Sequence, residues 1–444
     1  MTDSVKIRYN IFRSRYYLHL FSEWSVRMEI KRNIYLDKLI RKKKNGLIKV
    51  VTGIRRCGKS YLLLRLFHDH LLSSGVPEDH IIEVALDDRT NKDLRDPDAM
   101  LRFIKESIRD KEDYYIILDE VQYLGEFEDV LNSLLHIRNA DVYVTGSNSK
   151  FLSSDVITQF RGRGDELHVY PLSFSEYVSA YTGSMDEAWD DYLTYGGLPL
   201  LLAIEKPEDK AAYLNSLFQK GYISDIIERH NVRNKAELDE LVDILASAIG
   251  SYTNQNKLVR TFKSVKGKVI SDKTIKNYID YLIDSFLISK AVRYDIKGKR
   301  YIGSPSKYYF EDVGLRNARL GFRQVEQTHL MENVIYNELR IRGYHVDVGV
   351  VECSENDSTG ARKTKQLEID FIATKGSEKY YIQSAFALPT AEKINQEQRG
   401  FLHIPDFFRR IIVVGDNIKV RRDENGITTI GFRNFLLDEN SLRL

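Results

Sequence analysis

Two hydrophobic patterns alternate along the first part of the chain. Continuous apolar runs at 48–52 (IKVVT), 81–86 (IIEVAL), 114–118 (YYIIL) and 141–146 (DVYVTG) are typical of buried strands. Apolar residues at helical spacing follow from residue 60 (SYLLLRLFHDHLL) and recur near 97–108 and 126–138. Strands that alternate with helices predict an α/β fold with a parallel sheet covered on both faces, here over residues 28–170.

The pattern changes after residue 170. Strand signals fade over 171–285, where amphipathic helices dominate. Ile275, Tyr278, Ile279 and Leu282 then lie at helical spacing, and two β-type runs follow around the turn DIKGK. A helix followed by a β-hairpin resembles a winged helix. We therefore expect residues 171–322 to form a helical lid and a winged-helix-like domain.

A third pattern begins near residue 330. It predicts a helix at 330–342, strands at YHVDVGVVE, QLEIDFIA and KYYIQSAFA, a helix near 391–402 and a strand at RIIVVGD. Residues 323–444 are therefore expected to form a separate C-terminal α/β domain. A start at Met28 would lead directly into the first strand, so residues 1–27 are interpreted as an N-terminal extension. Arg13, Arg15 and His19 interrupt the apolar run there, which argues against a signal peptide.

Composition excludes several classes of protein. A chain of 444 residues suffices for about three domains. Lys and Arg number 66 against 64 Asp and Glu, so the net charge of +2 creates no global attraction to nucleic acid or acidic membranes. Cys57 and Cys353 are too few for a disulfide framework or a zinc site. So few cysteines fit a reducing compartment, and we expect a cytoplasmic protein. No run of 18 apolar residues occurs, so the sequence predicts no membrane span.

The stretch GIRRCGKS, between the first strand and the first helix, has the complete pattern G-x-x-x-x-G-K-[ST]. Backbone N–H groups of such a loop point at an anion, and the glycines remove side chains that would block its approach. In this pattern the lysine reaches the β- and γ-phosphates of ATP, and the serine hydroxyl binds Mg²⁺. The predicted nucleotide-binding residues are Gly53, Ile54, Arg55, Arg56, Cys57, Gly58, Lys59 and Ser60.

Two carboxylates follow the strand at 114–118. Asp119 at the strand end is expected to hold the Mg²⁺ shell together with Ser60, and Glu120 to orient or deprotonate the attacking water. Such a pair at a strand end is common in isolation. Together with the phosphate loop it indicates ATP hydrolysis.

Polar residues beyond the strand at 141–146 are further candidates. Ser147 and Asn148 lie where ligands of open α/β sheets bind, so a polar group there can sense the γ-phosphate or align the water. The alternative is that they cap a helix, and the two roles are compatible. Arg161 and Arg163 lie between glycines in QFRGRGDE. Either one stabilises transition-state charge, in its own chain or across a subunit interface, or both are ordinary solvated arginines.

These motifs, together with PLSFSEY, YGGLPLLL, KYYFEDVGLRNA and EIDFI, resemble the prokaryotic AAA-type ATPases (AAA_14-like) whose C-terminal half is a domain of unknown function (DUF4143-like). The resemblance extends from about Met28 to near the C-terminus. It implies an ATPase core, a winged-helix middle and a C-terminal fold similar to restriction endonucleases. It also favours Asn148 as a catalytic residue and Arg163 over Arg161 as the arginine finger.

Endonuclease-like folds place a helix Glu, a strand Asp and a following (D/E/Q)-x-K around metal ions. Glu332, Asp370 and Gln383 match this pattern, but Ala385 occupies the lysine position. Without that lysine the attacking water is not positioned, so we expect no DNA cleavage and only weak metal binding.

The leading hypothesis is an Mg²⁺-dependent ATPase that acts as a switch or motor. We expect a protein partner, which the sequence does not identify, and a homo-oligomer if Arg163 acts in trans. A second is an ATP-dependent DNA-binding module in which the winged helix contacts phosphates through Lys273, Lys276, Lys297, Lys299 and Arg300. An ATP-gated nuclease and a small-molecule kinase are less favoured, the latter because Glu120 suits water activation.

Overall fold

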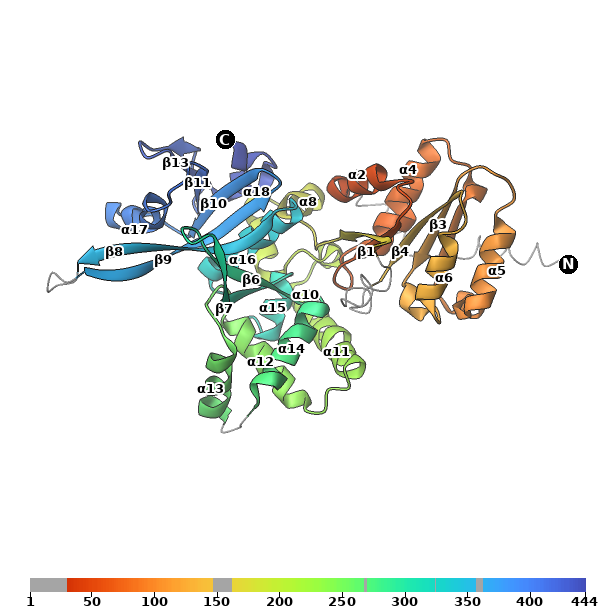
Figure 1. Cartoon of the computed structure of the whole chain (residues 1–444), viewed down its shortest axis with the longest axis horizontal. Helices are drawn as coiled ribbons and strands as arrows, with labels where there is room; N and C mark the ends of the chain where they lie inside the picture. The colour runs from red at the N-terminus through yellow and green to blue at the C-terminus, as the bar shows by residue number, and fades with distance from the viewer. Residues whose placement is uncertain (1–29, 147–161, 267–269, 324, 357–361) are drawn as a thin grey trace. The chain divides into compact units, whose positions relative to one another are not determined.

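The computed structural model describes residues 30–146, 162–266, 270–323, 325–356 and 362–444 (Figure 1). The chain divides into two units. The first contains Met1–Pro171, Ser179–Thr182 and Leu198–Ala203, and the second contains Leu172–Val178, Gly183–Gly197 and Ile204–Leu444. The two domains expected at 171–322 and 323–444 thus fall largely within one unit, and their separate boundaries stay predictions.

The first unit is built on a sheet of five parallel strands in the order β2-β3-β4-β1-β5 (Figure 1). The strands are β1 (Ile48–Thr52), β2 (Ile81–Ala85), β3 (Tyr114–Asp119), β4 (Ala140–Thr145) and β5 (Gly164–His168). This confirms the predicted parallel α/β fold. β5 was not predicted from the sequence, because its GDELH stretch contains a single apolar residue, Leu167, and no apolar run.

Helices cover both faces of this sheet. They are α2 (Asn33–Lys42), a run made of α3 (Lys59–Tyr61), π-helical turns (Leu62–Phe67) and α4 (His68–Ser73), then α5 (Pro97–Ser107) and α6 (Phe127–Leu134). Ile116 and Val142 pack on one face with Met100 of α5 and Val130 of α6. Because side chains alternate along a strand, Tyr143 points to the other face, where it contacts Phe67.

The second residue of β1 is a lysine, which would disrupt the buried sheet if it were unpaired. Lys49 has no solvent exposure, and its ammonium forms an ion pair with Asp141 on the neighbouring strand β4. Tyr143 donates a 2.8 Å hydrogen bond to the same carboxylate, and its ring lies 5.2 Å from the ammonium. The buried charge is therefore compensated within the sheet.

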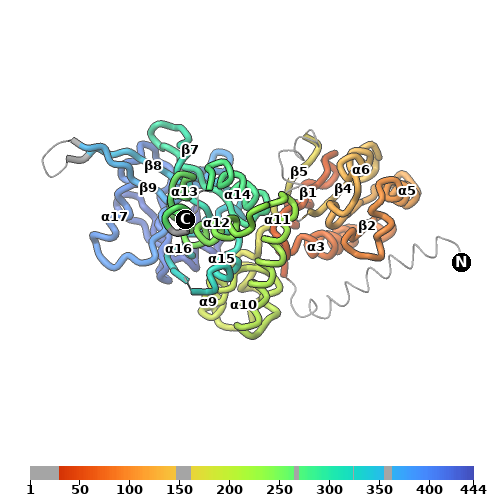
Figure 2. The backbone as a smooth tube through the Cα atoms, turned by 90° about the horizontal axis from the view of Figure 1, so that it is seen from below, coloured from red at the N-terminus to blue at the C-terminus, as the bar shows by residue number. Residues whose placement is uncertain are grey.

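The second unit contains a mixed sheet of eight strands in the order β12-β13-β11-β10-β9-β8-β6-β7. The strands are β6 (Ile288–Asp295), β7 (Arg300–Phe310), β8 (His345–Asn356), β9 (Arg362–Lys375), β10 (Glu378–Ala385), β11 (Arg409–Val414), β12 (Arg421–Arg422) and β13 (Ile427–Gly431). Figure 2 shows the long strands β8 and β9 running side by side. Figure 1 shows α16 and α17 beside the same sheet.

The helices of this unit confirm the predicted helical stretch after residue 170 and the predicted helices near 330–342 and 391–402. They are α8 (Phe174–Ala180), α9 (Met185–Tyr195), α10 (Pro207–Ser216), α11 (Ser224–Arg229), α12 (Lys235–Ser247), α13 (Gln255–Lys266), α14 (Asp272–Asp284), α15 (Val313–Arg319), α16 (Gln327–Ile341), α17 (Ala391–Leu402) and α18 (Phe432–Leu437). Among the described residues we find no helix with the length and apolar character that a membrane crossing requires.

The hairpin that the sequence suggested as a wing is β6 and β7. It does not stand alone, because β6 pairs in parallel with β8 over Arg293, Tyr294 and Asp295. The hairpin therefore forms one end of the eight-stranded sheet, with β7 as the edge strand. The winged-helix and endonuclease-like assignments stay predictions.

Two of the motifs that carry the resemblance meet in the second unit. Asp312 of EDVGLRNA accepts hydrogen bonds from the backbone of Gly197 at 2.8 Å and of Leu315 at 2.9 Å. Gly196 of YGGLP has φ +82°, and a Cβ atom there would lie 2.3 Å from Asp312 Oδ1. Burial raises the pKa of Asp312 to about 6. The glycines are therefore needed for the carboxylate to approach the backbone.

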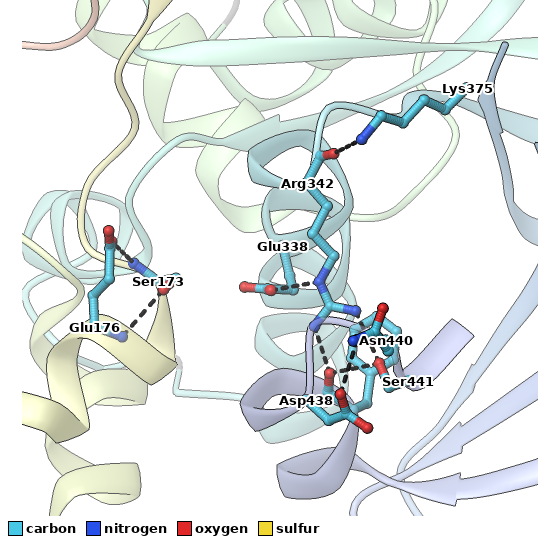
Figure 3. Close-up of polar contacts among 9 residues, drawn as sticks. Ser173, Glu176, Glu338, Arg342, Lys375, Asp438, Asn440 and Ser441 are labelled. Carbon is cyan, nitrogen blue, oxygen red and sulfur yellow. Dashed lines mark hydrogen bonds and ion pairs between the residues drawn. The ribbon is translucent and has the colours of Figure 1, made fainter. Parts of the chain in front are cut away.

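The C-terminal end is anchored on α16 through Arg342, as Figure 3 shows. Its guanidinium donates to Glu338 Oε1 at 2.7 Å, to Ser441 Oγ at 2.8 Å and to the Phe435 carbonyl at 2.5 Å. Burial raises the pKa of Glu338, and Arg342 opposes that rise. The buried guanidinium therefore links the end of α16 to Phe435 and Ser441 near the end of the chain.

Candidate functional site

The loop at 53–60 leaves the carboxyl end of β1 and leads into the helical run that begins at Lys59. Gly53 has φ +139°, and a Cβ atom there would lie 2.1 Å from the Val169 carbonyl oxygen, so only glycine fits. Gly58 has φ +100° and Arg56 has φ +66°. The loop therefore has the left-handed backbone geometry that allows successive N–H groups to converge on an anion.

Lys59 is buried and its ammonium closes this loop. Nζ donates to the carbonyl oxygens of Gly53 and Ile54, each at 3.0 Å. In these two contacts the buried ammonium is bonded to neutral acceptors of the loop. An anionic phosphate is a stronger acceptor than either carbonyl, so the ammonium is poised to exchange them for it.

Asp119 lies at the carboxyl end of β3, and the structure brings it to Ser60. Ser60 Oγ donates to Asp119 Oδ1 at 3.0 Å, and Thr145 Oγ1 donates to the same oxygen at 2.5 Å. Burial raises the pKa of Asp119 to about 6, against the lowering effect of these two hydrogen bonds. Serine and aspartate oxygens side by side suit Mg²⁺, which prefers oxygen ligands and takes few carboxylates when phosphates are bound.

Glu120 is held in an unusual backbone conformation next to this pair. Its φ is +52°, a left-handed value that is uncommon for a non-glycine residue. Its N–H donates to Thr145 Oγ1 at 2.8 Å, and Gln122 donates a side-chain hydrogen bond to its carboxylate. Strain of this kind persists where surrounding contacts impose it, which is common at functional sites.

Thr145 is a site residue that the sequence analysis missed. It ends β4, which lies between β1 and β3 in the sheet, and it contacts both Asp119 and Glu120. Its position just before Ser147 and Asn148 was the available signal. Ser147, Asn148 and Arg161 lie outside the described residues, so their predicted roles stay predictions.

Arg163 is exposed and is not brought to the phosphate loop of its own chain. Its carbonyl accepts from the N–H of Ile48, the first residue of β1, whereas the loop follows the last residue, Thr52. Arg163 and the loop therefore lie at opposite ends of β1, which has five residues and rises about 3.3 Å per residue. Its guanidinium contacts Asn132 Oδ1 at 3.3 Å. A role for Arg163 in hydrolysis therefore requires a neighbouring subunit.

Glu332 and Asp370 meet in the second unit around a residue that the sequence analysis did not consider. Lys307 of β7 places its ammonium 2.8 Å from Glu332, 2.6 Å from Glu368 and 3.6 Å from Asp370. Tyr309 donates a further 2.7 Å hydrogen bond to Glu332. The cluster thus contains an ammonium although residue 385, at the end of β10, is alanine. That ammonium comes from β7.

The electrostatics of this cluster are those of a closed ion network. Burial lowers the pKa of Lys307, but the charges of Glu332, Asp370 and Glu368 outweigh it and hold the pKa well above its ordinary value. Burial, opposed by Lys307, raises the pKa of Asp370 well above its usual range. Gln383 accepts a 3.4 Å hydrogen bond from the Asp370 N–H. The described residues contain no group of three or more His, Cys, Asp or Glu side chains that could hold a metal ion.

A shift in strand register explains how two consecutive side chains of β9 reach one face. Asp347 of β8 pairs with Ile372, whereas Gly349, two residues on, pairs with Ile369, so β9 contains one extra residue. Asp370 faces Lys307, and Phe371 lies 5.9 Å from Tyr309 on the same strand as Lys307. Such a bulge re-aims a side chain that regular alternation would turn away.

The five basic residues suggested for DNA contact lie at two exposed places in the second unit. One place is on α14, where Lys276 pairs with Asp280 at 3.3 Å, and the other is the turn between β6 and β7. In that turn Lys297 donates to the Glu352 carbonyl at 2.6 Å, and Arg300 lies 3.5 Å from Asp295. DNA binding through these residues stays a prediction.

Comparison with known protein families defines the class of the first unit. Residues 45–178 match the family described as AAA domain, so the chain carries an AAA-type P-loop ATPase domain. Residues 186–326 match a domain of unknown function, DUF8612. The expected DUF4143-like assignment is therefore wrong. The motifs quoted for it, YGGLPLLL and KYYFEDVGLRNA, lie within the segment that matches DUF8612.

Whole-chain relatives extend this result. A Haemophilus influenzae protein described as uncharacterized is 33% identical over 392 residues, which cover 87% of this chain and 93% of the relative. The chain belongs to the same family of AAA-domain proteins as this relative. A Methanocaldococcus jannaschii protein, also described as uncharacterized, is 27% identical over 362 residues, or 78% of this chain and 76% of the relative.

Two solved structures are more distant. The Aeropyrum pernix ORC1 protein in complex with DNA has a TM-score of 0.26 and 12% identity, covering 66% of this chain and 93% of that one. AMPPCP-bound DnaA from Aquifex aeolicus has a TM-score of 0.27 and 15% identity, covering 56% and 86%. At such low TM-scores these similarities support no conclusion about this protein.

Proposed function

We propose that this protein binds ATP with Mg²⁺ at the loop 53–60 and hydrolyses it, acting as a switch or motor. The observation that carries the proposal is the 3.0 Å hydrogen bond between Ser60 Oγ and Asp119 Oδ1 beside the buried ammonium of Lys59. A hydroxyl and a carboxylate that already touch can share one small cation. The AAA-domain match over the same residues supports the proposal.

Each side chain has a defined part in the proposed reaction. Bound Mg²⁺ would supply neutralisation of phosphate charge, and Ser60 and Asp119 would hold it. Lys59 would release the Gly53 and Ile54 carbonyls and bind the β- and γ-phosphates. Glu120 would accept a proton from the attacking water or orient it.

Two variants separate binding from hydrolysis. Lys59→Ala should abolish ATP binding measured by calorimetry, because the phosphates lose their cation. Glu120→Gln should bind ATP normally but turn over at least about a hundredfold more slowly, as for the loss of a general base. Lys105→Ala and Glu106→Gln, exposed residues on α5, are matched controls and should behave as wild type.

The proposed function fails if wild-type protein binds no ATP, or if Lys59→Ala binds it as well as wild type. Equal loss of binding in Lys59→Ala and Glu120→Gln would instead contradict the separate roles of the two residues.

A further inference from the structure

An arginine outside the sequence motif is attached to the phosphate loop. Arg32 lies immediately before α2 and is only 2% exposed. Its Nη1 donates to the carbonyl of Cys57 in the loop at 2.8 Å, and its Nη2 donates to the carbonyl of Tyr170 at 2.7 Å. One guanidinium therefore joins the loop to the segment that follows β5.

Tyr35 orients this guanidinium. Its ring lies 4.5 Å from Arg32 Cζ, and its fully buried hydroxyl accepts a 3.2 Å hydrogen bond from the Tyr170 N–H. The two side chains thus hold both polar groups of the Tyr170 backbone, one each. A planar guanidinium stacked on an aromatic ring has little freedom, so the position of Nη1 at the loop is fixed by α2.

The bond to Cys57 has a consequence for the next residue of the loop. In a trans peptide the C=O of Cys57 and the N–H of Gly58 point in opposite directions. By holding that carbonyl, Arg32 turns the Gly58 N–H away from itself. A Cβ atom on Gly58 would lie 3.6 Å from Arg32 Nη1, so the arginine packs directly behind this glycine.

We propose that Arg32 is a positioning residue of the nucleotide site, which orients the Cys57–Gly58 peptide so that the Gly58 N–H binds a phosphate oxygen of ATP. This inference rests on the proposed function, because it concerns the same ATP site. Arginine suits the role better than lysine, since its fork reaches two carbonyls that belong to separate segments.

The test compares Arg32→Ala and Arg32→Lys with Arg41→Ala, which replaces an exposed arginine near the other end of α2. Arg32→Ala should weaken Mg·ATP binding by about 10- to 100-fold, as for the loss of charge-assisted hydrogen bonds that align the loop. Arg32→Lys should recover part of this loss because an ammonium can still hold one carbonyl. Arg41→Ala should bind as wild type.

Steady-state kinetics distinguish positioning from a general structural role. In Arg32→Ala the KM for ATP should rise by the same factor as the dissociation constant while kcat changes less than about threefold, because the lost contact acts equally in ground and transition states. A lower kcat with an unchanged KM, which is the result expected if part of the sample is unfolded, would overturn the inference. If Arg32→Ala does not fold, Arg32→Lys decides, and a wild-type KM in that variant also overturns it.

The outcomes also separate this inference from the proposed function. If Lys59→Ala abolishes binding but both Arg32 variants bind normally, the proposed function stands and the role of Arg32 is refuted. If wild-type protein binds no ATP, both are refuted.

Discussion

Replacing Lys307 by methionine should strongly destabilise the second unit. Only 4% of the lysine side chain is exposed, and its ammonium lies 2.8 Å from Glu332, 2.6 Å from Glu368 and 3.6 Å from Asp370. At an effective dielectric constant of 20 each contact supplies roughly 5 to 6 kcal/mol of attraction before desolvation is subtracted. Methionine preserves the apolar stem but leaves the buried carboxylates without their cation, a change that costs about 3–5 kcal/mol.

Urea unfolding followed by near-ultraviolet circular dichroism measures this loss. Lys290→Met is the matched control, because Lys290 is exposed on the neighbouring strand β6 and its replacement should change the free energy of unfolding by less than about 0.5 kcal/mol. A second variant, Lys307→Met combined with Glu368→Gln, removes one of the uncompensated charges. It should be more stable than Lys307→Met alone.

The destabilisation should also depend on pH in a defined direction. A carboxyl whose pKa is raised on folding, such as Asp370, contributes stability that is present below the ordinary pKa of 3.8 and is lost as the pH rises through the folded value. Without Lys307 the pKa of Asp370 rises further. The loss in free energy of unfolding caused by Lys307→Met should therefore be smaller at pH 5 than at pH 8. A loss below about 1 kcal/mol, or an equal loss in Lys290→Met, would refute the assignment of Lys307 as the shared cation.

Three further results are expected. Mg·ATP affinity should fall between pH 7.5 and 5.5, because burial raises the pKa of Asp119 to about 6 and the protonated carboxyl binds the metal poorly; calorimetry that shows equal affinity at both pH values would contradict this. If a neighbouring subunit supplies Arg163, mixed Arg163→Ala and Lys59→Ala chains should regain part of the ATP turnover, and the absence of any gain would exclude a trans role. Plasmid DNA should stay intact with Mg²⁺ or Mn²⁺, with or without ATP, whereas nicking that disappears in Asp370→Ala would reveal a nuclease.

The phosphate loop could be predicted from the sequence because its function is local. Gly53, Gly58 and Lys59 act through the backbone of a single turn between one strand and one helix, and their spacing alone specifies it. Asp119 was also predictable, since an apolar strand precedes it and strand ends meet at one edge of a parallel sheet.

The partners that complete each site come from distant parts of the chain. Arg32 reaches a carbonyl 25 residues away, and Lys307 meets a glutamate 25 residues away on another element. Neither has a spacing rule, because the contact depends on how helices and strands pack. The sequence likewise predicted the β6–β7 hairpin from its turn but not its pairing with β8, which local hydrophobic patterns do not specify.

The chain passes between the two units more than once, and this limits how the protein can be divided. A fragment that ends at Pro171 lacks Leu198–Ala203, which belongs to the first unit. In that segment Pro199 lies 3.9 Å from where a Cβ of Gly58 would be, so the missing piece packs close to the nucleotide loop. A fusion or gene rearrangement that transplants the ATPase domain must therefore carry sequence through at least residue 203, together with the helices between. In this chain the segment that completes the first unit is therefore separated from the rest of that unit by α9, which belongs to the second.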